Sequence, residues 1–110
     1  MRTFIALMLT ATALALPAGA SAGGTKVTVT ATEFHFKLSR STVPHGKVTF
    51  VLVNKGHLKH DFKIAGKKTP QIGPGKTATL VVTLAKGSHP YSCTVPGHAA
   101  AGMKGTLKAT

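Results

Sequence analysis

The chain has 110 residues, a formal net charge of +12 and a single cysteine. This length accommodates one domain at most, and the lone cysteine excludes a disulfide within the chain. The excess of Lys and Arg favours acidic partners, such as an acidic protein face or an anionic lipid or cell-surface polymer. The basic residues are spread along the sequence, which argues against nucleic acid as a partner.

The first 22 residues have the layout of a secretory signal peptide. A positively charged start precedes residues 4–16, an uncharged and mostly apolar run of 13 residues. This run is shorter than the roughly 18 apolar residues that a membrane-spanning helix needs. Small residues follow Pro17, and we expect cleavage after Ala22, with Ala20 as the alternative position. The sequence therefore predicts an exported protein that is periplasmic, extracellular or held at the cell surface.

The mature domain is then residues 23–110, which carry a formal net charge of +11 from 13 basic and two acidic residues. Alternating or short apolar runs predict strands, in chain order, at residues 27–31, 34–38, 48–53, 61–65, 79–84, 88–93 and 105–108. Segments rich in Gly, Pro, Asn and Lys separate these runs. Seven to eight short strands at this spacing predict an all-β fold, a Greek-key β-sandwich or barrel.

A cluster of potential metal ligands lies near the C-terminus, in the stretch YSCTVPGHAAAGMKG. Cys93, His98 and Met103 are five residues apart, and this spacing fits neither one helical face nor a single strand. Pro96 and the glycines predict a loop instead, and a loop of this size can aim three side chains at one point. Thiolate, imidazole and thioether ligands together favour copper.

A second imidazole would complete the ligand set of two histidines, one cysteine and a weak axial methionine that is typical of electron-transfer copper. The stretch NKGHLKHDF offers His60 and His57 as candidates. His60 directly precedes the strand predicted at 61–65, so we expect sheet hydrogen bonds to fix its position. His57 lies within the predicted turn and is the less favoured alternative.

Other interpretations of these residues are weaker. Cys93 after Tyr91 would suit an immunoglobulin-type strand, but the chain has no second cysteine and no tryptophan. A structural zinc site usually has four cysteine or histidine ligands, and a thioether is a poor substitute. His35, His45 and His89 have no comparable context, and we expect them on strand faces or in turns.

With these two motifs, the mature chain resembles the cupredoxin family of type 1 blue copper proteins, close to the azurin, plastocyanin and rusticyanin branches. The resemblance implies that His60, Cys93 and His98 bind one copper ion in a plane and that Met103 caps it. Asp61 stands where azurins and plastocyanins often have asparagine. A carboxylate can accept the same backbone hydrogen bonds but cannot donate one, so we expect a different reduction potential from that of relatives.

The function that this resemblance implies is one-electron transfer between redox proteins by a monomer, and not enzymatic catalysis. A copper carrier or buffer that uses the same ligands is the alternative, and a metal-free cationic β-sandwich that binds anionic surfaces is a third. Residues 94–103 contain no charged side chain, so we expect an uncharged docking surface around His98. The surrounding lysines would steer acidic partners towards it.

Overall fold

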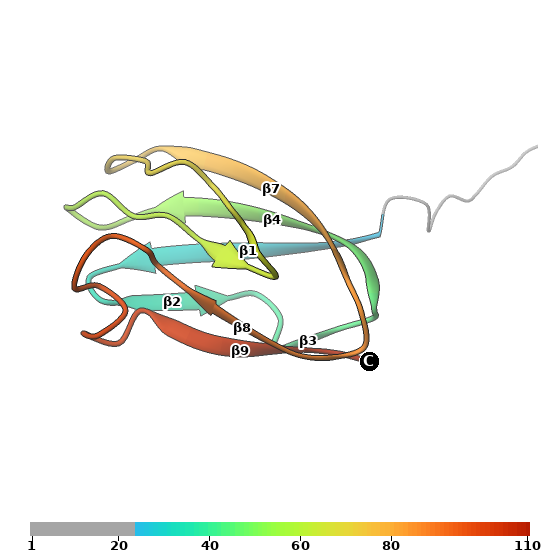
Figure 1. Cartoon of the computed structure of the whole chain (residues 1–110). Coiled ribbons are helices and arrows are strands. Elements are labelled where there is room, and N and C mark those ends of the chain that lie inside the picture. The colour runs from blue at the N-terminus through green and yellow to red at the C-terminus, as the bar shows by residue number, and fades with distance from the viewer. Residues whose placement is uncertain (1–23) are drawn as a thin grey trace, which may run out of the picture.

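The fold is a sandwich of two β-sheets, and a computed structural model describes residues 24–110 of it (Figure 1). Nine strands and no helix occur within these residues, which confirms the all-β prediction. No helix in the described part of the chain is therefore long and apolar enough to cross a membrane. The predicted signal peptide lies outside the described residues.

The first sheet has the strand order β2-β1-β4-β7. Its members are β1 (Thr25–Thr32), β2 (His35–Leu38), β4 (Gly46–Asn54) and β7 (Thr77–Leu84). β1 pairs in parallel with β4, which places Val29 opposite Leu52, and β7 pairs antiparallel with the other side of β4. In β1 and β4 every second side chain is buried, because successive side chains on a strand point to opposite faces.

The second sheet has the order β3-β9-β8-β5-β6. Its members are β3 (Thr42–Val43), β5 (Lys63–Ile64), β6 (Lys67–Lys68), β8 (Gly87–Ser92) and β9 (Lys104–Ala109). The hydrophobic core between the sheets includes fully buried side chains from both layers, among them Val27, Val29, Phe50, Leu52, Phe62 and Leu107. Phe62 contacts Phe50 and Phe36 of the first sheet through ring centroids 5.1 and 5.4 Å apart.

The predicted strands all have a counterpart, but one of them was predicted too long, and this difference bears on function. The strand expected at 61–65 shrinks to Lys63–Ile64, because Asp61 and Phe62 belong to a loop. The two-residue strands β3 and β6 were not predicted, and β6 lies in a segment expected to be a turn. Strands this short carry too few residues for an alternating pattern to be visible.

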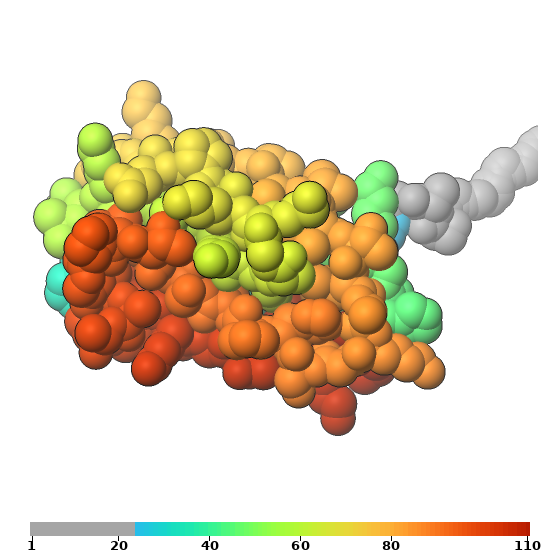
Figure 2. Space-filling view, viewed as in Figure 1, coloured from blue at the N-terminus to red at the C-terminus, as the bar shows by residue number. Residues whose placement is uncertain are grey.

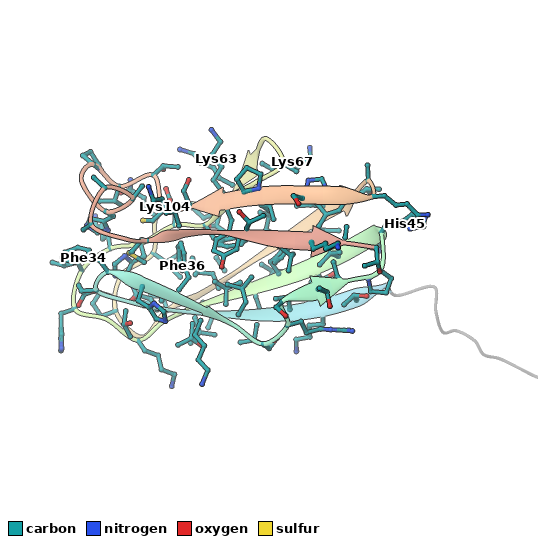
Figure 3. All side chains as sticks on the ribbon, turned by 90° about the horizontal axis from the view of Figure 1, so that it is seen from below. Phe34, Phe36, His45, Lys63, Lys67 and Lys104 are labelled. Atoms are coloured by element: carbon teal, nitrogen blue, oxygen red, sulfur yellow. The ribbon has the colours of Figure 1, made fainter. Side chains whose placement is uncertain are left out.

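Three loops gather at one end of the sandwich, drawn at the left of Figure 1. They are the turn after β1, the loop after β4 and the loop after β8. The C-terminus lies at the opposite end (Figure 1). Phe34, in the turn after β1, and His45 occupy these two ends in the side-chain view of Figure 3. The loops after β4 and β8 contain the residues that the sequence singled out as metal ligands.

Candidate metal centre

His60, Cys93 and His98 come together between the loops after β4 and β8. Their ligand atoms all lie within 4.8 Å of one another. Cys93 Sγ is 3.6 Å from His98 Nδ1 and 4.0 Å from His60 Nδ1, and the two Nδ1 atoms are 3.2 Å apart. All three residues are buried, and His98 is the most exposed of them at 7%. One thiolate and two imidazoles in this arrangement fit a single copper ion.

A tight loop between β8 and β9 positions Cys93, His98 and Met103. The backbone N–H of Cys93 donates to Met103 O at 3.0 Å, and the N–H of Met103 donates to His98 O at 3.1 Å. Gly97 and Gly102 have positive φ angles of 85° and 121°, which side chains with a Cβ rarely adopt. The loop is thereby folded back on itself, as predicted, and the side chain of Met103 is fully buried.

His60 is held by backbone hydrogen bonds, although not by those of the strand expected to contain it. It forms an isolated bridge with Ile72: His60 N–H donates to Ile72 O at 3.1 Å, and Ile72 N–H donates to His60 O at 2.9 Å. Its side chain is completely buried, whereas His57 is exposed. The structure thus brings His60, and not His57, to Cys93 and His98.

The family of the chain follows from its sequence taken as a whole. A model of the cupredoxin-like domain matches residues 3–107. The chain belongs to the cupredoxin-like family. In a cupredoxin, this His–Cys–His cluster supports one copper ion as the cofactor. No curated protein matched the sequence.

Solved structures of auracyanins share the fold of this cupredoxin. Auracyanin B is 22% identical with a TM-score of 0.66, and the match covers 78% of this chain and 88% of auracyanin B. Dithionite-reduced auracyanin from Roseiflexus castenholzii is 22% identical with a TM-score of 0.63, covering 80% and 97%. Auracyanin A, described as a blue copper protein from Chloroflexus aurantiacus, is 20% identical with a TM-score of 0.66, covering 79% and 100%.

Asp61 joins the two ligand-bearing loops of this cupredoxin. Its Oδ1 accepts a hydrogen bond from the backbone N–H of Thr94 at 2.6 Å, and its Oδ2 accepts one from the Thr94 hydroxyl. The carboxylate is fully buried. Asp61 therefore accepts a backbone hydrogen bond from the other loop, as the sequence predicted, and it fixes the residues next to His60 and Cys93 against each other.

Glu33 is a contact of the site that sequence reasoning missed. Its Oε2 lies 2.6 Å from His60 Nε2, and its Oε1 accepts the backbone N–H of His57 at 2.8 Å. These hydrogen bonds, first from the His57 backbone and then from the His60 ring, lower the pKa of the Glu33 carboxyl. The sequence did offer one indication that Glu33 has a specific role: Glu33 and Asp61 are the only acidic residues in the chain.

Burial also sets the protonation of the candidate ligands. Desolvation lowers the pKa of His98, and the neighbouring His60 lowers it further, because both disfavour the charged imidazolium. A neutral imidazole is the form that binds a metal. Burial raises the pKa of the Cys93 thiol, so in the metal-free protein this cysteine is a weak nucleophile.

The remaining histidines lie away from the cluster. His35 is exposed on β2. At the far end, His45 Nδ1 is 2.9 Å from Thr110 O, and His89 Nε2 is 2.7 Å from Ala85 O. These positions agree with the prediction of strand-face and turn residues.

Proposed function

We propose that this cupredoxin is an exported one-electron carrier that binds a single copper ion through His60, Cys93, His98 and Met103. The observation that carries the proposal is the convergence of three buried donors within 4.8 Å in a chain of the cupredoxin-like family. Met103 would supply the weak axial thioether that completes this kind of site. The fold likeness to auracyanin A, whose description names a blue copper protein, supports the same function.

The protein's contribution is to hold the ligands still. Bound copper would supply the redox chemistry, because it can change between Cu(II) and Cu(I). The Asp61–Thr94 hydrogen bonds connect the loops of His60 and Cys93, and the bond from Cys93 N–H to Met103 O closes the second loop. Ligands that are tied together in this way move little when the metal charge changes, which favours fast electron transfer.

Burial of the ligands favours a carrier over an enzyme. His60 and Met103 are fully buried, and His98 is 7% exposed, so a substrate has little access to the metal position. A groove of about 770 Å³ lies elsewhere, lined by residues of β5, β8 and β9 and of the β5–β6 turn. None of the four proposed ligands lines it. Electron transfer needs no open ligand position, and it needs only a short path from the metal to the surface.

That path would run through His98. The loop around it exposes Pro96, Gly97, Ala100 and Ala101, all uncharged, and it occupies one end of the molecule in Figure 2. Leu58, exposed to 45%, belongs to the adjoining loop. An uncharged surface of this kind is easily desolvated against a partner redox protein, since no charge must be buried.

Lysines lie near the uncharged loop after β8 and would guide the approach of partners. Lys55 and Lys59 are exposed in the loop after β4, and Lys104 is exposed at the start of β9. The chain has a formal net charge of +12. We expect redox partners with acidic docking faces, because complementary charge raises the rate of encounter. Weak contact with anionic cell-surface groups and a monomeric state belong to the same proposal.

The decisive experiment is to add Cu(II) to the purified protein and to record its visible spectrum and its redox cycle. A strong visible band from the bond between thiolate and copper, together with a reversible one-electron wave, supports the electron carrier. A colourless mixture with Cys93 reduced overturns the metal site. Rapid loss of copper to a chelator of modest affinity would contradict the electron carrier and favour a copper carrier that transfers the metal to other proteins.

A further inference from the structure

The two nitrogens of the His60 ring face different groups. Nδ1 lies 3.2 Å from His98 Nδ1 and 4.0 Å from Cys93 Sγ. Nε2 lies on the other side of the ring, 2.6 Å from Glu33 Oε2. An ionised carboxylate can only accept a hydrogen bond, so this contact requires the ring proton on Nε2. In the neutral imidazole Nδ1 is then the unprotonated nitrogen, and it is the one that faces Cys93 and His98.

Glu33 is itself fixed in this orientation by the loop after β4. Its carboxylate accepts the backbone N–H of His57 at 2.8 Å and that of Leu58 at 3.4 Å. Gly56 leaves room for it, because a Cβ at this position would lie 2.1 Å from Glu33 Oε2. The carboxylate is thus held in place before any metal binds.

The turn that carries Glu33 also touches the second imidazole. Phe34 packs edge-on against His98, with ring centroids 5.0 Å apart and an interplanar angle of 71°. A Cβ at Gly102 would lie 3.3 Å from Phe34 O, so the ligand loop packs closely against this turn. The β1–β2 turn therefore contacts both histidines, although it contributes none of the predicted ligands.

We infer that Glu33 is a positioning residue of the metal site, which holds His60 in the tautomer that binds metal through Nδ1 and lowers the reduction potential. The inference rests on the proposed function for its redox part. A carboxylate behind a ligating imidazole fixes the ring and makes it more basic, and loss of such a partner typically costs about 10- to 100-fold in metal affinity. Its negative charge also favours the oxidised, more positive state of the site.

Two substitutions separate the hydrogen bond from the charge. Glu33→Gln removes the charge and keeps one acceptor oxygen, which can accept from either His60 Nε2 or the His57 backbone N–H, whereas Glu33→Ala removes the charge and both acceptors. Ser41→Lys is the matched control, because it raises the net charge by the same amount at the exposed residue 41. Ser41 lies next to β3, which pairs with the end of β9 far from Met103.

The first measurement uses the metal-free protein. We expect ¹⁵N NMR to find the Nε2–H tautomer of His60 in the unchanged protein and in Ser41→Lys, and a mixture of tautomers in Glu33→Ala. An unaltered His60 tautomer in Glu33→Ala overturns the positioning role. This result does not depend on copper, so it separates failure of the inference from failure of the proposed function.

The second measurement is the reduction potential of the copper-loaded protein. We expect Glu33→Gln to weaken Cu(II) binding about tenfold relative to Cu(I), which corresponds to a rise of about 59 mV for a one-electron couple. Ser41→Lys should leave the potential close to that of the unchanged protein. Equal potentials in Glu33→Gln and Ser41→Lys would overturn the electrostatic role of Glu33.

Discussion

Cys93 is the residue on which the colour and the redox chemistry of the proposed site depend. It is 1% exposed and lies between the two histidines. We expect Cys93→Ser to abolish the strong visible absorption of the copper-loaded protein, because a hydroxyl does not provide the thiolate-to-copper charge transfer. Visible spectroscopy with measured copper content checks this. A coloured Cys93→Ser protein would contradict the assignment of the thiolate ligand.

His60 and His57 provide a matched pair at the same scale, since they lie three residues apart in one loop. His60 is buried against Cys93, whereas the His57 side chain is exposed and only its backbone contacts Glu33. We expect His60→Ala to weaken Cu(II) binding by more than the about 100-fold upper range for loss of an outer hydrogen-bond partner. His57→Ala should change it little. Competition titrations with a chelator measure both, and the reverse order would identify the wrong ligand.

At the scale of elements, the site depends on how closely the turn after β1 packs on the loop after β4. Gly56 is the point of contact, because a Cβ there would overlap the Glu33 carboxylate. We expect Gly56→Ala to push the carboxylate, the end of a flexible side chain, away from His60. The hydrogen bonds that Glu33 then loses should destabilise the protein by about 1–3 kcal/mol. Its copper-loaded form should then show the raised reduction potential expected of Glu33→Gln.

Gly73→Ala is the control for this substitution. It adds the same methyl group in a loop where a new Cβ meets no atom within 4 Å. We expect a change in the free energy of unfolding within about 0.5 kcal/mol. Denaturant unfolding of both variants makes the comparison, and equal stabilities would contradict the close packing of Gly56 on Glu33.

At the scale of the whole molecule, the distribution of charge over the surface should control how redox partners approach. The sandwich places the uncharged loop after β8 at one end and has lysines exposed elsewhere on the surface, including Lys63, Lys67 and Lys104 in Figure 3. We expect the rate of electron transfer to an acidic redox protein to fall steeply as salt rises from 0.01 to 1 M, because the screening length shortens from about 30 to about 3 Å. Stopped-flow kinetics test this, and a flat salt profile would exclude electrostatic steering.

The sequence alone was sufficient for the strand pattern and for identifying His60, Cys93 and His98, which the structure brings together. Long alternating segments such as β1 and β4 were predicted because burial of one sheet face imposes a period of two. The order of His60, Cys93, His98 and Met103 in loops of an all-β chain was likewise visible, since soft ligands at those positions have a distinctive chemistry. Short strands without a visible alternation, such as β6, were missed.

Only the tertiary structure decided which groups surround these ligands. The bridge between His60 and Ile72 and the contact between Glu33 and His60 join segments that are 12 and 27 residues apart. No local pattern records such contacts, because they arise when the two sheets pack and bring three loops to one end. The sequence thus determined what kind of metal this protein can hold, and the packing of the sheets decided how each proposed ligand is oriented.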